Sequence, residues 1–238
     1  VTADSVNLTW QGSGNHNSWL VYLVPNNGSI ASTTPFSLTN DSAVLPVNPS
    51  TTYNFFVSGI CNSGDTSILA GPIVFTTPCT FTPAPYFTNF NSGFPLCWSQ
   101  EVTNDIFDWT LDANGTSSSS TGPSDDITGG GNYLYIETSS PRSLGDNAIL
   151  YSPNIDISTL NVGQLRFYNH MYGATIADLT IEISDNGGLT YDTIFNKFGD
   201  QGNQWNEETV TLSNYSGIVH FKVSATTGSS FTGDIAVG

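Results

Sequence analysis

The stretch Gln164–Leu179, QLRFYNHMYGATIADL, decides the fold because its apolar residues recur with period two. Leu165 and Phe167 fall on one side of an extended chain, and the residues between them fall on the other. Gly173 permits a turn, and the alternation restarts within 179–183. The stretch therefore predicts an antiparallel pair of strands at the centre of a β-sandwich.

Further landmarks surround this stretch in a fixed order. They are Phe90-Asn91, Cys97-Trp98, Phe107-Asp108-Trp109, Thr121-Gly122-Pro123 with Asp126, Gln201–Trp205 and Gly233–Ala236. Together with FYNHMYG and DLTIEIS they resemble the signature of the MAM domain, an extracellular jelly-roll module. Ile127 stands where that family usually has His. The resemblance covers Tyr86 to Gly238 and implies a jelly roll, but a fold by itself hosts many functions.

The part of the chain before this region also reads as strands. Val6, Leu8 and Trp10 alternate, which predicts a strand with one apolar face. Val47–Tyr53 resembles the L-x-P-x-T-x-Y corner of fibronectin type III domains, in which the Tyr hydroxyl ties a sandwich corner to nearby backbone. The expected all-β chain thus has two tandem β-sandwiches, divided into a fibronectin type III-like domain at 1–78 with its first strand largely missing, a Pro-rich linker at 79–85 and a MAM-like jelly roll at 86–238.

The composition indicates an exported protein. The 238 residues include 20 acidic and 4 basic side chains, for a net charge of −16, so the surface depends on Ser, Thr, Asn and Gly. Binders of nucleic acid and of anionic membranes need basic patches, and no apolar run reaches the length of a membrane span. We expect a fragment of a larger secreted or cell-surface protein, similar in style to exported multidomain proteins of flavobacteria.

The chain has three cysteines, Cys61, Cys79 and Cys97. The strands that precede Cys61 and Cys79 should form a hairpin, with Cys61 at its turn and Cys79 at its far end. At about 3.3 Å per residue this puts the two roughly 20 Å apart, whereas a disulfide needs Cα atoms within about 7 Å. We expect Cys79–Cys97 as the disulfide, with Cys61 paired to a residue upstream of Val1.

No catalytic constellation is present in the sequence. The three histidines are scattered, and no H-E-x-x-H, G-x-S-x-G or Cys–His pairing occurs. His170 lies within the MAM-like signature beside aromatic residues, where a hydrogen-bonded structural role is expected. We therefore expect a non-catalytic chain, although the parent protein could be a secreted hydrolase.

The resemblance to MAM domains also implies a structural cation. Mapped by motif, the candidate ligands are Asn91, Asp126 and Asp234. Calcium takes six to eight oxygens from carboxylates, amides and backbone carbonyls, which suits this set. Asn91 replaces the usual Glu of the family and removes one charge. The alternative is that these groups cap loops by hydrogen bonding.

Two further kinds of site are expected on the surface. Asp4-Ser5-Val6, Asp41-Ser42-Ala43 and Asp192-Thr193-Ile194 resemble the O-glycosylation motif of Bacteroidetes, with Ser5, Ser42 and Thr193 as acceptors. The aromatic candidates for a sugar-binding platform are Trp19, Tyr191 and Trp205, and core packing is the alternative for each. The Ser/Gly-rich segment 114–131 is expected to be a long surface loop, the usual place for binding function.

The leading functional hypothesis is extracellular recognition, in which the chain binds another protein or a glycan as an adhesion module. In MAM domains protein contact is the usual role. The first alternative is a carbohydrate-binding accessory region of a secreted polysaccharide-degrading enzyme. The second is a structural spacer.

Overall fold

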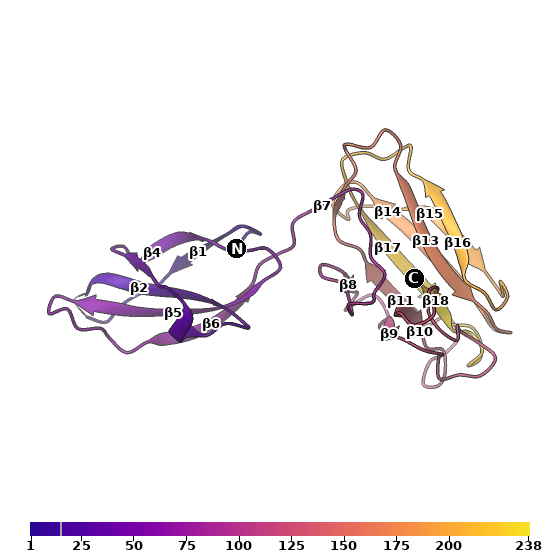
Figure 1. Cartoon of the computed structure of the whole chain (residues 1–238), viewed down its shortest axis with the longest axis horizontal. Helices are drawn as coiled ribbons and strands as arrows, with labels where there is room; N and C mark the ends of the chain where they lie inside the picture. Colours follow the sequence, from indigo (N-terminus) through magenta and orange to yellow (C-terminus); the bar gives the residue numbers. More distant parts are fainter. Residues whose placement is uncertain (15) are drawn as a thin grey trace. The chain divides into compact units, whose positions relative to one another are not determined.

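The chain folds into two compact units built almost entirely from β-strands. The computed structural model describes residues 1–14 and 16–238, which divide into Val1–Thr80 and Phe81–Gly238. Apart from one 3-10 turn, η1 (Ile30–Ser32), the described residues form strands, turns and irregular segments (Figure 1). The expected all-β class is confirmed.

The first unit has two sheets around a small core. One sheet pairs β1 with β4, and the other has the order β3-β2-β5-β6. The predicted alternation buries Val6 and Trp10, and the Trp10 ring lies 6.1 Å from the ring of Phe55 on the other sheet. The strands are β1 (Ser5–Thr9), β2 (His16–Pro25), β3 (Phe36–Leu38), β4 (Ser42–Pro46), β5 (Thr52–Cys61) and β6 (Ala70–Thr76).

A tyrosine fixes one corner of this unit. The hydroxyl of Tyr53 accepts a hydrogen bond of 2.9 Å from the backbone N–H of Asn48, and the Tyr53 ring stacks on Phe75. This is the contact that the sequence Val47–Tyr53 indicates. Such a corner is a property of sandwich geometry, so the assignment of this unit to the fibronectin type III family stays a prediction.

The second unit is a sandwich of two larger sheets. The five-stranded sheet has the order β16-β13-β18-β10-β9, and the seven-stranded sheet runs β15-β14-β17-β11-β8, with β12 paired to β17 and β7 paired to β12. The strands are β7 (Thr82–Pro83), β8 (Ser99–Gln100), β9 (Thr110–Asp112), β10 (Tyr133–Ile136), β11 (Asn147–Tyr151), β12 (Ile155–Asp156), β13 (Gln164–Met171), β14 (Asp178–Ser184), β15 (Asp192–Phe198), β16 (Asn206–Thr211), β17 (Ile218–Thr226) and β18 (Ile235–Val237).

The core of this unit lies between the two sheets. Leu134 and Met171 enter it from the five-stranded sheet, and Leu150 and Leu179 enter it from the seven-stranded sheet, all fully buried. Burial of each such side chain contributes about 1.5–3 kcal/mol, so this core dominates the stability of the unit.

One predicted pairing is wrong. β13 and β14 occupy the expected stretches, but β13 pairs with β16 and β18, whereas β14 pairs with β15 and β17 in the other sheet. The connection that begins at Gly173 crosses between the sheets instead of closing a hairpin. Gly173 has a φ of +145°, and a Cβ there would lie 2.3 Å from the carbonyl oxygen of Thr232. Period two indicates which face of a strand is buried, and it does not indicate the neighbouring strand.

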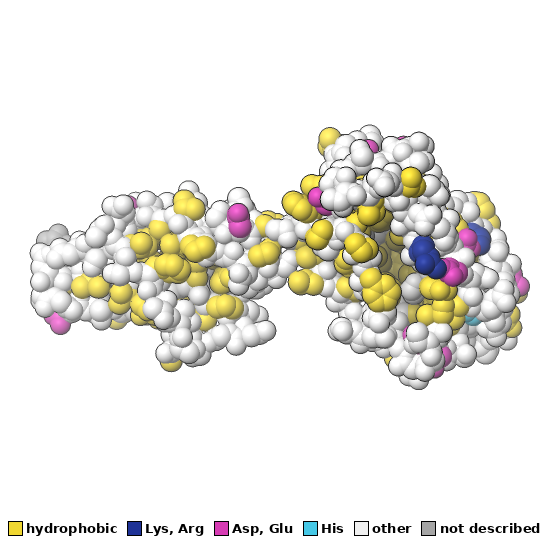
Figure 2. All heavy atoms as spheres, turned by 45° about the horizontal axis from the view of Figure 1, so that its top comes forward, with side chains coloured by type: hydrophobic (Ala, Val, Ile, Leu, Met, Phe, Trp, Pro, Cys, Tyr) yellow, Lys and Arg dark blue, Asp and Glu magenta, His cyan; other side chains and the backbone are white. Residues whose placement is uncertain are grey.

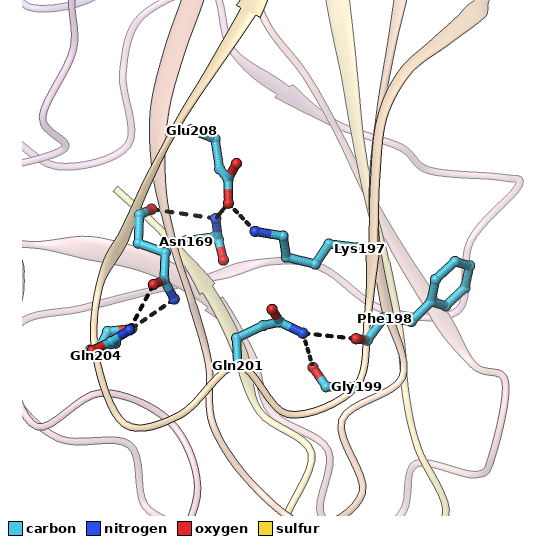
Figure 3. A network of polar contacts seen from close by, with 8 residues as sticks. Asn169, Lys197, Phe198, Gly199, Gln201, Gln204 and Glu208 are labelled. Carbon is cyan, nitrogen blue, oxygen red and sulfur yellow. Dashed lines mark hydrogen bonds and ion pairs between the residues drawn. The ribbon is translucent and has the colours of Figure 1, made fainter.

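Edge strands of the two sheets are joined by a polar network (Figure 3). Lys197 on β15 forms an ion pair with Glu208 on β16, and the buried Asn169 donates to the same carboxylate at 3.3 Å. Nearby, the rings of Phe167 and Phe195 meet edge to face at 5.0 Å. These contacts link the edges of the two sheets along one side of the sandwich.

Candidate functional site

Each sheet of the second unit turns aromatic side chains away from the core. On the five-stranded sheet these are Tyr133 and Tyr135, which alternate with the core residue Leu134. On the seven-stranded sheet they include Tyr151 and His220, which alternate with core residues in the same way. We call these two surfaces the outer faces of their sheets.

A long loop covers the outer face of the five-stranded sheet. We call the segment 114–131 the covering loop. It accepts hydrogen bonds at two carbonyls, from the Tyr133 hydroxyl at Asn114 and from the Trp205 indole at Asp125. Its Thr121 hydroxyl donates to the Tyr172 carbonyl at 2.9 Å. We expected a long surface loop, but residues 121–123 in its middle are buried because these contacts tie the loop to several strands.

The covering loop and Trp205 seal an aromatic cluster. Tyr133 is fully buried, and the Trp205 ring contacts the rings of Tyr133 at 5.7 Å and His170 at 5.5 Å. His170 is 2% exposed, and its Nε2 is 3.0 Å from Asn203 Oδ1. Burial lowers the pKa of His170, outweighing the Asn203 contact, which raises it. The outer face of this sheet therefore packs against the chain's own loop.

Two of the expected cation ligands lie together at one end of β10. A Cβ on Gly131 would lie 2.3 Å from Asp126 Oδ2 and 2.4 Å from Asn91 Oδ1, so both oxygens converge on one small space. Asp126 Oδ1 accepts the N–H groups of Gly130 and Gly131, and Asn91 Oδ1 accepts that of Asn132 at 2.7 Å. Glycine is required here because any side chain would fill this space.

The charge state of Asp126 suits a ligand. Burial raises its pKa, but hydrogen bonds from Thr128, Gly131 and Gly130 together outweigh burial, so the pKa lies below the usual value. No group of three or more His, Cys, Asp or Glu able to hold a metal occurs within 1–14 and 16–238. A cation at this end of β10 would therefore depend on amide and carbonyl oxygens as well as on Asp126.

The third expected ligand lies elsewhere. Asp234 precedes β18, and its Oδ1 accepts the backbone N–H of Thr138, just after β10, at 3.0 Å. Asp126 instead contacts Gly131, just before β10. Seven residues of extended chain at about 3.3 Å each separate Gly131 from Thr138, which puts the two carboxylates on the order of 20 Å apart. The three residues do not form a single cluster.

Asp234 is a buried acid with only one of its two oxygens hydrogen-bonded within the described part of the chain. It is 0% exposed, and its Oδ2 has no hydrogen-bond partner among the residues that the structure describes. Burial raises its pKa to about 6, and the charge of Glu137 adds to the shift, while the Thr138 N–H opposes it. A buried carboxylate with one unpartnered oxygen destabilises the fold when it is ionised.

The outer face of the seven-stranded sheet carries a half-buried aromatic group. Tyr191, directly before β15, places its hydroxyl 2.6 Å from Nε2 of His220 on β17. Its ring centroid lies 6.2 Å from that of Tyr151 on β11. Lys222 lies over the Tyr191 ring at 5.5 Å and pairs with Glu182 at 2.7 Å. We call these five residues the tyrosine face.

Sequence reasoning identified Tyr191 and missed the rest of the tyrosine face. The signal was present in the period-two pattern, because His220 and Lys222 alternate with the core residues Val219 and Phe221 and so had to point outward. Only the order of strands in the sheet brings them beside Tyr191, and no single stretch of sequence predicts that order.

The remaining expected residues are distributed over both units. Trp19 packs against the core of the first unit, with its ring 6.1 Å from that of Trp10. Cys79 and Cys97 are disulfide-bonded, whereas Cys61 forms no disulfide within the described residues, so its pairing with a residue upstream of Val1 stays a prediction. The expected glycosylation acceptors lie on strands, Ser5 on β1 half-buried, Ser42 on β4 exposed and Thr193 on β15 exposed. No helix in the described part of the chain has the length and apolar character to cross a membrane.

Residues 88–238 match one known protein family, described as MAM domain, meprin/A5/mu. MAM domain-containing glycosylphosphatidylinositol anchor protein 1 of Rattus norvegicus is 38% identical over 149 residues, covering 60% of this chain and 15% of the relative. Neuropilin-1 of Xenopus laevis is 32% identical over 141 residues, covering 59% of this chain and 14% of the relative. The chain thus spans about 15% of the length of the curated relatives that it matches.

Two solved structures are similar at lower identity. The K1 cleaved adhesin domain of Lys-gingipain from Porphyromonas gingivalis W83 has a TM-score of 0.45 and 18% identity, covering 63% of this chain and 92% of that one. A structure of carbohydrate-binding modules from the beta-sandwich super family has a TM-score of 0.40 and 16% identity, covering 100% of this chain and 90% of that one.

The raised pKa of Asp234 predicts a pH-dependent stability. The protonated acid contributes stability that is complete below the unfolded pKa of 3.8 and is lost as the pH rises through about 6. We expect Asp234→Asn to raise the free energy of unfolding at pH 8, in chelator, by up to about 3 kcal/mol. The gain should vanish at pH 3.5. Denaturant unfolding at the two pH values measures it, and a loss of stability at pH 8 would contradict the assignment.

Proposed function

This chain belongs to the MAM domain family of extracellular adhesion-type modules, and we propose that it is a recognition module of a larger secreted or cell-surface protein. The domain itself is non-catalytic. One relative is MAM domain-containing glycosylphosphatidylinositol anchor protein 1, and its name supports a location outside the cell. In this proposal the chain supplies binding, and any chemistry belongs to other parts of the parent protein.

The tyrosine face is the proposed contact surface for a partner protein. The observation that carries this is the difference between the two tyrosine pairs, because Tyr133 and Tyr135 are buried under the covering loop, whereas Tyr151 and Tyr191 are half-buried beside one another. Tyrosine is enriched at protein interfaces because it gives a large apolar contact and one polar group for little entropy. Lys222 and Glu182 add paired charges at the edge of that contact.

A glycan is the second candidate ligand of the same face. The Tyr191 ring lies within a group that includes His220 and Glu182, and an aromatic ring beside acid and imidazole groups suits sugar binding. In that case the chain is an accessory region of a polysaccharide-degrading enzyme. The third candidate function is a structural spacer, which requires that the tyrosine face binds no ligand.

A binding screen with matched variants tests the proposed surface. The purified chain is passed over an array of extracellular-matrix proteins and, in parallel, over native gels that contain plant and algal polysaccharides. We expect a protein ligand, and we expect Tyr191→Ala to weaken its binding at least tenfold. Tyr168→Ala, on the outer face of the other sheet, should change it less than twofold.

Three outcomes would contradict this proposal. Retardation by a polysaccharide alone, sensitive to Tyr191→Ala, would establish the glycan reading. Equal losses in the two variants would remove the tyrosine face as the contact surface. Binding of neither class would favour a spacer.

A structural calcium ion held by Asn91 and Asp126 is a further part of the proposal. Two facing oxygens across Gly131, with hydrogen bonds that fix both side chains, give the start of an oxygen-rich site. Calcium would draw the rest of its six to eight ligands from backbone carbonyls and water. Asp234 is left out of this site because it lies at the other end of β10.

Calcium binding at this site should raise the free energy of unfolding, and substitutions in the site should enlarge or abolish that effect. We expect calcium at 100 times its dissociation constant to add about 2.7 kcal/mol to the free energy of unfolding. Asn91→Asp adds a negative charge to the site and should tighten calcium binding, while Gly131→Ala should abolish it by filling the space. Thermal unfolding in calcium and in chelator measures both. Identical curves in the two buffers, for the unaltered chain and for Asn91→Asp, would contradict a site here.

A further inference from the structure

We propose that an acidic hollow beside the tyrosine face receives a basic segment of a partner protein that also carries aliphatic side chains. This inference rests on the proposed function, because it names the chemistry of the partner for that same surface. The hollow has a volume of about 590 Å³ and lies between the segment after β8 and Arg142.

The walls of the hollow combine acids with exposed aliphatic groups. Glu101, Asp105 and Asp108 line it, together with Val102 and Ile106. Val102 is 86% exposed and Ile106 is 62% exposed, although both are apolar. Apolar side chains beside carboxylates suit a segment in which basic and aliphatic residues alternate, because an extended chain can direct them to different walls.

The carboxylates of the hollow repel one another. Burial raises the pKa of Asp105, and the negative charges of Asp108 and Glu101 raise it further, against the hydrogen bond from the Ile149 N–H. Arg142 is the basic side chain of the lining, and it already lies over the Phe107 ring at 4.2 Å. An added cation would relieve the remaining repulsion, which gives a basic ligand a direct electrostatic gain.

One hydrogen bond joins the lining of the acidic hollow to the tyrosine face. Tyr151 donates to Glu101 Oε2 at 2.9 Å, so the two residues link the aromatic group to the acidic lining. Rings on both surfaces already attract the chain's own cations, Arg142 at Phe107 and Lys222 at Tyr191. A partner segment that crosses from the hollow to the tyrosine face would meet acids and aromatic rings in succession, and both favour Arg and Lys.

A second copy of this chain cannot supply such a segment. The sequence has four basic side chains and a net charge of −16. Arg166, Lys197 and Lys222 form ion pairs within the chain, and the fourth, Arg142, lines the hollow itself. Figure 2 shows the same balance on one face, where each dark-blue group lies beside a magenta one. The occupant must therefore be a different, basic protein.

Binding of short synthetic peptides tests the inference. The probes are fluorescein-labelled (Arg-Leu)4 and (Glu-Leu)4, and fluorescence anisotropy of the full chain measures their affinity at 50 and 300 mM NaCl. We expect (Arg-Leu)4 to bind and to weaken at the higher salt, and (Glu-Leu)4 not to bind. Asp108→Lys should weaken the binding of (Arg-Leu)4 at least tenfold, and Val102→Ser should weaken it about threefold.

Asp65→Lys is the matched control, because it makes the same charge change in the first unit and should alter the affinity less than twofold. Equal weakening by Asp65→Lys and Asp108→Lys would overturn the inference, since binding would then follow net charge alone. Failure of (Arg-Leu)4 to bind, or equal binding of (Glu-Leu)4, would also overturn it. If the Tyr191→Ala effect on a matrix protein persists after such a failure, only the basic segment is excluded and the recognition surface stands.

Discussion

The packing of the covering loop onto the outer face of the five-stranded sheet is the constraint on which the second unit depends. The loop is tied to the strands around it through Thr121, which contacts Asp234 before β18 and Tyr172 after β13, and through Asp125, whose carbonyl accepts the Trp205 indole N–H. Buried backbone groups need partners, and these contacts provide them at positions where no neighbouring strand is available. The loop therefore acts as a further layer over Tyr133 and Tyr135 of the five-stranded sheet, whereas Tyr151 and Tyr191 on the seven-stranded sheet stay half-buried.

This arrangement explains why the fold was readable from the sequence and the surface was not. Alternation at Leu165 and Phe167, and again within 179–183, marks two strands that the structure confirms. Their pairing could not be read, because Gly173 serves a crossing between sheets as well as it serves a hairpin. The role of Trp205 was equally hidden, since its indole is held by the carbonyl of Asp125, eighty residues earlier in the chain.

The expected cation ligands show the same limit at the scale of single residues. Asn91 and Asp126 meet because a glycine at 131 leaves room between them. Asp234 carries the right chemistry, but it is paired with Thr138 at the far end of a strand. Residue type and order along the chain were sufficient to nominate these groups, and only the register of β10 against β18 separates them.

The scarcity of basic residues shapes both the stability and the recognition surface. Lys197 forms an ion pair that joins the edges of the two sheets, and Lys222 forms one within the tyrosine face. Both positive charges are therefore already paired inside the chain. The exposed acids then remain unbalanced, which keeps copies of the chain apart and favours partners of opposite charge. The same composition thus underlies both the self-repulsion of the chain and the proposed recognition surface.

Hydroxyl-radical footprinting with mass spectrometry tests whether the covering loop shields the five-stranded sheet, because the oxidation rate of a tyrosine follows its access to solvent. We expect slow oxidation of Tyr133 and Tyr135 under the covering loop and fast oxidation of Tyr151 and Tyr191 on the tyrosine face. Oxidation of Tyr133 and Tyr135 at the rate of Tyr191 would show that the loop leaves the five-stranded sheet open, and it would contradict the account.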